Sequence, residues 1–109
     1  MRDALVPAAT QAAATLHALL VGFGDDVTLE HKAGQMRYAR GGRLFCILKP
    51  MARRCDVAFR RFSRARSRRV LAARGRLPFL PYLVEVEAPG DVDSELRAWL
   101  RESYEIALE

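Results

Sequence analysis

Apolar residues recur at helical spacing near both ends of the chain. Near the start they are Ala12, Leu16, Leu19, Leu20 and Phe23, and this spacing predicts a helix over Pro7–Gly22 with one apolar face. Near the end the corresponding stripe is Val92, Leu96, Trp99, Leu100 and Ala107. Asp91 precedes this stripe and is a residue type that caps helices, so the last helix is predicted to begin there.

Between these helices the apolar residues alternate with polar ones, which is typical of half-buried strands. Strands are predicted at Val27–Lys32, around Met36–Tyr38, at Arg43–Lys49, from Cys55 to Phe59 and at Tyr82–Glu87. Gly41-Gly42 indicates a hairpin, and the third strand is apolar on both faces, so we expect it to be central in the sheet. The fold class predicted for residues 1–109 is a single α+β domain. It would be a two-layer sandwich, an antiparallel meander of about five strands with the N- and C-terminal helices on one face.

The charge of the chain is divided into two poles. Ten arginines lie in the range Arg53–Arg76 with one acid, Asp56, so this range carries a formal charge of +9. The rest of the chain has eight basic and twelve acidic side chains and carries −4. Like charges repel, so such a range needs solvent, salt or an anion around it.

The arginine-rich range has no clear secondary-structure pattern. Ser63 or Ser67 could cap a helix, Val70, Ala73 and Leu77 form a weak apolar set, and Gly75 would end it. We therefore expect residues 63–77 to be a basic insert, either a short helix or a loop, between the fourth and fifth strands.

The first functional hypothesis is a non-enzymatic module that binds a polyanion, with RNA or DNA favoured because arginine forks fit phosphate. The residues predicted to contact phosphate are Arg60, Arg61, Arg64, Arg66, Arg68 and Arg69. Alternation places Phe59 with Val57 on the core side and Phe62 with Arg60 on the other, so Phe62 is the candidate for base stacking. Phe62 could instead cap the end of the sheet. The arginines could instead form a solvated face that acids of Glu85–Glu109 partly neutralise.

The second hypothesis is a protein interaction or self-association domain. Its basic range would dock on an acidic partner, or on the acidic Glu85–Glu109 pole of another copy in a homodimer or longer assembly. An enzyme is a third class, although no Gly-x-Ser-x-Gly, phosphate loop or His-Glu-x-x-His occurs. Glu30, His31, Tyr38 and Asp56 would have to come together across strands, and Asp56 is expected to pair with Arg54 instead.

No cofactor or metal is predicted. Cys46 and Cys55 lack the close spacing of a zinc knuckle, and His17 and His31 fall on different elements. In the hairpin around Pro50, Cys46 should lie nearer Ala58 than Cys55, which disfavours a disulfide. The start Met1-Arg2-Asp3 is unlike a signal peptide. We expect a cytoplasmic protein with reduced thiols and no membrane partner.

Three segments carry a family resemblance: QMRYARGGRLFCILKP at 35–50, CDVAFRRF at 55–62 and DVDSELRAWLRESYEIA at 91–107. They resemble a family of uncharacterised bacterial domains related to YdhG-like and YjbR-like proteins, over about Val27–Ala107. The resemblance implies a two-layer α+β fold, similar in shape to frataxin, in a group with some members suspected of binding nucleic acid. It implies no catalytic residues, and the basic insert Arg60–Arg76 departs from the family pattern.

Overall fold

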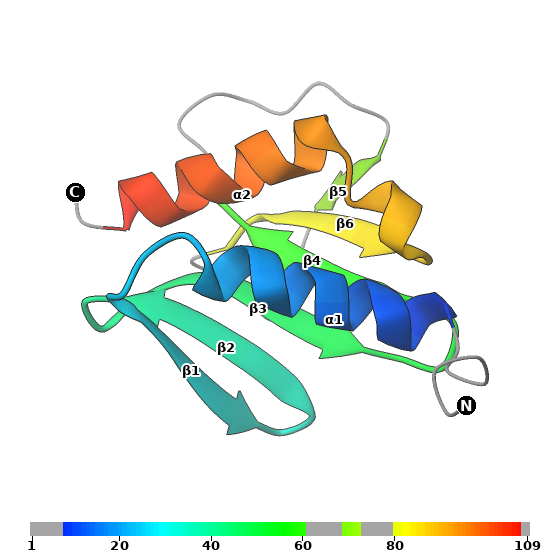
Figure 1. The fold of residues 1–109 in the computed structure, drawn as a ribbon, viewed down its shortest axis with the longest axis horizontal. Coiled ribbons are helices and arrows are strands. Elements are labelled where there is room, and N and C mark those ends of the chain that lie inside the picture. The colour runs from blue at the N-terminus through cyan, green and yellow to red at the C-terminus, as the bar shows by residue number, and fades with distance from the viewer. Residues whose placement is uncertain (1–7, 61–68, 73–79, 108–109) are drawn as a thin grey trace.

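The computed structural model describes residues 8–60, 69–72 and 80–107. Within them the element order is α1 (Ala8–Val21), β1 (Val27–Lys32), β2 (Gln35–Arg40), β3 (Arg43–Pro50), β4 (Cys55–Phe59), β5 (Val70–Ala72), β6 (Tyr82–Val86), the 3₁₀ helix η2 (Pro89–Asp91) and α2 (Ser94–Ile106). The predicted α+β class is therefore confirmed, with two α-helices and an antiparallel sheet of six strands among the described residues (Figure 1).

The strand order in the sheet is β1-β2-β3-β4-β6-β5, and every pair of neighbours is antiparallel. The five predicted strands, which are β1 to β4 and β6, lie side by side in the predicted meander order. The additional strand β5 precedes β6 in the chain but lies outside β6 at the edge of the sheet. The predicted number of about five strands is too low by the edge strand β5.

Residues 70–72 form the strand β5, where a short helix or a loop was expected. Val70 lies opposite Val84 and packs against the main core, and Leu71 lies opposite Leu83. The three residues thus alternate between the two faces of the sheet, and they pair with backbone groups of β6 that would otherwise be unpaired at an edge. Three residues are too few for an alternating pattern to be recognised in the sequence.

Two tight hairpins set the register of the first three strands. Gly41 and Gly42 have φ values of 57° and 80°, which is the left-handed backbone that a two-residue hairpin between right-twisted strands requires. Ala33 and Gly34 do the same between β1 and β2, with φ values of 53° and 75°. Ala33 is thus a residue with a side chain in a conformation that favours glycine.

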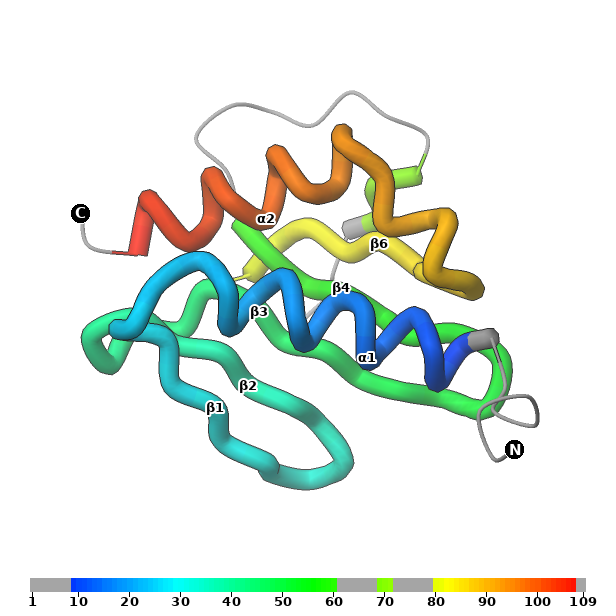
Figure 2. The backbone as a smooth tube through the Cα atoms, viewed as in Figure 1, coloured from blue at the N-terminus to red at the C-terminus, as the bar shows by residue number. Residues whose placement is uncertain are grey.

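Both helices contribute to one core. Leu16 and Leu20 of α1 and Leu96 and Leu100 of α2 are fully buried in the same cluster as Tyr38, Cys46, Leu48, Val57, Phe59, Val84 and Val86 of the sheet. Figure 2 shows the two helices on the same side of the strands. A smaller cluster of Ile47, Ala58 and Leu80 lies apart from this core. Alternation along β3 and β4 places it on the other face of the sheet.

A β-bulge in β3 adds an aromatic ring to the core. Tyr38 lies opposite Cys46 and Ala39 opposite Leu44, so Phe45 has no residue directly across from it. The extra residue lets Phe45 and Cys46 both turn to the helices, and both are fully buried in the main cluster. The carbonyl of Phe45 accepts a hydrogen bond from the Ser103 hydroxyl of α2, which fixes the helix against the bulge.

The cap of α2 differs from the prediction. Asp93, not Asp91, caps the helix, because its side chain accepts a hydrogen bond from the Leu96 N–H at 3.0 Å. Asp91 instead accepts from the N–H groups of Glu87 and Ala88, and so closes η2. Two aspartates two positions apart can both cap a turn, and the sequence alone did not separate their roles.

Candidate nucleic-acid interface

Two of the seven predicted contact residues, Arg60 and Arg69, are among the described residues. The other five, Arg61, Phe62, Arg64, Arg66 and Arg68, lie outside them. Arg60 directly follows β4 and Arg69 directly precedes β5. The described residues therefore include the two residues that flank the segment 61–68.

The first end is held by α2. The backbone N–H of Arg60 donates to the hydroxyl of Ser103 at 3.2 Å, and the same hydroxyl donates to the carbonyl of Phe45. Ser103 is fully buried, so it satisfies a donor at the end of β4 and an acceptor at the bulge of β3. The Arg60 Nε is buried without a hydrogen-bond partner among the described residues.

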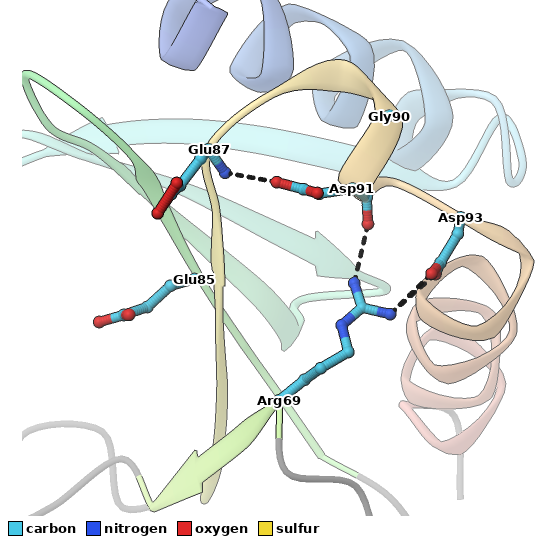
Figure 3. Close-up of a pocket in the computed structure, with 6 residues that line it drawn as sticks. All are labelled: Arg69, Glu85, Glu87, Gly90, Asp91 and Asp93. Carbon is cyan, nitrogen blue, oxygen red and sulfur yellow. Dashed lines mark hydrogen bonds and ion pairs between the residues drawn. The ribbon is translucent and has the colours of Figure 1, made fainter.

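The second end is held by the start of α2 and by η2. Arg69 Nη1 lies 2.8 Å from Asp93 Oδ2 and 3.2 Å from Glu95 Oε1, and Nη2 donates to the Asp91 carbonyl at 2.8 Å. Figure 3 shows the guanidinium pointing toward Asp91 and Asp93. Its Cζ also lies 5.8 Å from the centre of the Trp99 ring. Arg69 thus fastens the beginning of β5 to the N-terminus of α2.

The charges at this contact stabilise one another. The Leu96 N–H and then the Arg69 guanidinium lower the pKa of Asp93. Burial alone would lower the pKa of Arg69, but hydrogen bonds and charges from Asp93 and Glu95 raise it. The alternative interpretation of the arginines, in which acids of Glu85–Glu109 partly neutralise them, is therefore confirmed for Arg69.

Arg54 is neutralised in a similar way. Its Nε lies 2.8 Å from Asp56 Oδ1, as predicted, and 3.4 Å from Glu85 Oε2. Asp56 and Glu85 lie directly opposite each other on β4 and β6, where two like charges would repel. Arg54 joins the two carboxylates, and the hydrogen bond to Asp56 raises its pKa. We therefore assign Arg54 to the scaffold rather than to a binding surface.

A cavity of about 430 Å³ adjoins Arg69 and is mainly acidic. Its lining residues are Arg69, Glu85, Glu87, Gly90, Asp91 and Asp93. The side chains of Glu85 and Glu87 point away from Arg69 in Figure 3. As long as Asp93 stays bound to Arg69, the four carboxylates against one guanidinium disfavour phosphate in this cavity.

The strands present their aromatic rings to the helices. The aromatic residues of the described strands are Tyr38, Phe45, Phe59 and Tyr82, and all of them belong to the main core or pack against it. Phe59 is stacked on Trp99 of α2, with ring centres 6.0 Å apart. The placement of Phe59 on the core side is therefore confirmed. The other face of the sheet has no aromatic ring among the described strand residues to stack on a base.

The described residues offer little for other chemistry. They contain no group of three or more His, Cys, Asp or Glu side chains that could hold a metal ion, and no helix among them is long and apolar enough to cross a membrane. Cys46 and Cys55 are free and buried, and burial raises the pKa of Cys55 to about 12 and that of Cys46 well above its usual value. As expected, Cys46 lies nearer Ala58 than Cys55, directly opposite Phe59.

Two polar contacts were not predicted from the sequence. His17 Nδ1 of α1 lies 2.8 Å from the Tyr38 hydroxyl, so one of the two histidines holds a buried tyrosine. Asp26, Arg40 and Tyr104 form a second network between the turn after α1, β2 and α2. These residues are far apart in the chain, and no local spacing indicated that they would meet.

One family model matches the chain. It is described as a domain of unknown function (DUF5655), and it covers residues 4–107. No curated protein and no solved structure matches the chain.

Proposed function

The chain belongs to the DUF5655 family of domains of unknown function, and from this premise we propose that it is a small non-enzymatic module that binds nucleic acid through an arginine-rich stretch. The phosphate-binding set is Arg60, Arg61, Arg64, Arg66, Arg68 and Arg69, and Phe62 is the ring proposed to stack on a base. The closer relation to bacterial YdhG-like and YjbR-like proteins, the two-layer arrangement and a cytoplasmic location are part of the same proposal.

The observation that carries the proposal is a stretch without acids, residues 57–84, in which the residues on both sides of the arginine-rich segment 61–68 are held in place. None of the residues 57–84 is acidic, whereas eight of them are arginine. Arg60 is tied to Ser103, and Arg69 to Asp91, Asp93 and Glu95. The two residues that flank the segment 61–68 are therefore both held by contacts with α2 or with the turn before it. The segment itself contains four arginines and no acid. Phosphate groups would offset their mutual repulsion by releasing counterions.

The position of the aromatic rings supports recognition of the backbone rather than of the bases. The rings of the described strands face the helices, so the sheet itself offers no platform like that of single-strand binding sheets. The binding is therefore proposed to be mainly electrostatic and tolerant of sequence. Phe62→Ala should weaken binding to a single strand by about 1–3 kcal/mol, the usual contribution of one stacked base, and should change duplex binding little.

The contacts of Arg69 favour a second candidate, an interaction domain for an acidic protein or for another copy of the chain. Arg69 binds two carboxylates within the chain, which is the chemistry that an acidic partner would offer. Light scattering as a function of ionic strength tests self-association. A monomer at all salt concentrations that still binds nucleic acid would exclude self-association as the main role.

A mobility-shift titration with matched variants tests the proposed function. Arg64→Glu/Arg68→Glu should abolish the shift of a short DNA duplex at low salt. The control Lys32→Glu/Arg43→Glu changes the net charge equally, from +5 to +1, outside the acid-free stretch, and should keep most of the binding. Equal losses in both variants, or no shift of the unmodified chain, would overturn the proposal. Poly-glutamate competing as well as DNA would support the acidic partner instead.

A further inference from the structure

Arg69 holds two roles that exclude each other. It is one of the proposed phosphate-binding residues, and its guanidinium already binds the carboxylates of Asp93 and Glu95 (Figure 3). We infer that Asp93 and Glu95 act as an intramolecular competitor of nucleic acid, so that Arg69 contacts phosphate only after they have been displaced. This inference rests on the proposed function and adds to it a contact that limits affinity.

The carboxylate of Asp93 lies where a bound anion would lie. Its Oδ1 accepts from the Leu96 N–H and from Arg69 Nη1, both at 3.0 Å. A helix N-terminus and a guanidinium together are a typical environment for a phosphate oxygen. Here a side chain of the same protein fills that environment, and Glu95 adds a second negative charge 3.2 Å from the same nitrogen.

The contact is exposed enough to exchange. The relative exposure is 29% for the Arg69 side chain, 48% for Asp93 and 53% for Glu95. Ion pairs this exposed are weak and screened by salt. Arg69 need not leave its place, because Nη2 can keep the Asp91 carbonyl at 2.8 Å while Nη1 exchanges a carboxylate for a phosphate. The arginine fork has donors for both contacts.

Trp99 provides a local signal for the exchange. It is the one tryptophan of the chain, its ring centre lies 5.8 Å from Arg69 Cζ, and it is stacked on Phe59. Nucleic acid that draws Nη1 of Arg69 away from Asp93 should therefore change the fluorescence of Trp99. The same titration of Arg69→Gln should give a much smaller change.

The direct test removes the competing charges and keeps the cap. Asparagine is as good an N-cap as aspartate, so Asp93→Asn/Glu95→Gln should fold. It should bind a short DNA duplex about two- to fivefold more tightly, as expected from the strength of exposed ion pairs. The matched control Asp25→Asn/Glu30→Gln removes two exposed acids near the opposite edge of the sheet and should gain less. If the double variant is unstable, Glu95→Gln alone leaves the cap intact and should show a smaller gain.

Arg69→Gln in the background of Asp93→Asn/Glu95→Gln tests whether the gain in DNA affinity depends on Arg69. It should remove the gain, whereas Arg69→Gln in the unmodified chain should change affinity by less than the gain. A gain that persists without Arg69, or one equal to that of the control, would overturn the inference and leave the proposed function intact. No binding by the unmodified chain or by any variant would overturn both.

Discussion

The hydroxyl of Tyr104 donates a hydrogen bond to Asp26 Oδ1 at 2.7 Å and thereby joins the last helix to the turn that follows the first. Arg40 completes the link, because its Nε binds Asp26 Oδ2 at 2.8 Å and its Cζ lies 3.9 Å from the centre of the Tyr104 ring. Hydrogen bonds from Arg40 and then Tyr104 lower the pKa of Asp26. The network holds α1, β2 and α2 together at one end of the domain.

Gly24 leaves the space that the Tyr104 hydroxyl occupies. A Cβ at this position would collide with the hydroxyl and lie 2.8 Å from Asp26 Oδ1. We expect Gly24→Ala to lower the free energy of unfolding by about 1–3 kcal/mol, as overpacking usually does. Tyr104→Phe alone should also destabilise, because it removes the hydrogen bond to Asp26.

In the Gly24→Ala background, Tyr104→Phe should cost less or even stabilise, because it removes the atom with which the new methyl group collides. Urea denaturation of the four proteins in this double-mutant cycle measures the coupling. Gly90→Ala is the control, since nothing lies within 4 Å of its Cβ position. Additive effects of Gly24→Ala and Tyr104→Phe would contradict the described contact.

Ser103 should be essential to the anchoring of the arginine segment. Ser103→Ala leaves the Arg60 N–H and the Phe45 carbonyl without their described partner. The expected loss of unfolding free energy is about 1–3 kcal/mol, the usual cost of leaving a buried polar group unsatisfied. Ser94→Ala, at an exposed position of the same helix, should change stability much less. Equal effects of the two substitutions in thermal or urea denaturation would contradict this role.

Ala33 should be replaceable with a gain in stability. Its φ of 53° costs a residue with a side chain about 1–2 kcal/mol, and glycine avoids this cost but is more flexible when unfolded. Ala33→Gly should therefore raise the free energy of unfolding by about 0.5–1 kcal/mol. Ala52→Gly, at an exposed bend without a positive φ, should lower it instead. A loss of stability in Ala33→Gly would show that the hairpin has another backbone conformation.

Stability should fall in alkaline solution because of the buried thiols. Thiols of the unfolded chain ionise near pH 9.0, whereas burial raises the pKa of Cys55 to about 12 and that of Cys46 well above its usual value. Above pH 9 the unfolded state therefore binds fewer protons than the folded state. The free energy of unfolding must then decrease as the pH rises toward the folded pKa values. Cys46→Ala/Cys55→Ala should give a shallower decrease between pH 9 and pH 12. An unchanged slope would contradict the burial of the thiols.

Much of the fold could be predicted because its signals are local. The period of the apolar residues located both helices and five strands, and Gly41-Gly42 located a hairpin. Arg54 and Asp56 were predicted to pair, being two positions apart next to β4. The edge strand β5 was missed because its three residues obtain their conformation from β6 and not from their own pattern.

The partners of the candidate site were harder to predict, because they depend on tertiary placement. Arg69 meets Asp93 and Glu95 only because β5 adds to the edge beside the start of α2. The sequence indicated that acids of Glu85–Glu109 could neutralise arginines. It did not indicate which arginine they would bind. Tyr104 and Asp26 are separated by 78 positions, and no spacing within one element connects them.

The salt dependence of DNA binding tests the central claim most directly. If the acid-free stretch engages about five phosphates, a log–log plot of the association constant against salt concentration should have a slope of about −4 to −5. The slope should become clearly shallower in Arg64→Glu/Arg68→Glu and stay near that value in Lys32→Glu/Arg43→Glu. A slope near zero, or one that is the same in both variants, would contradict phosphate binding by this stretch.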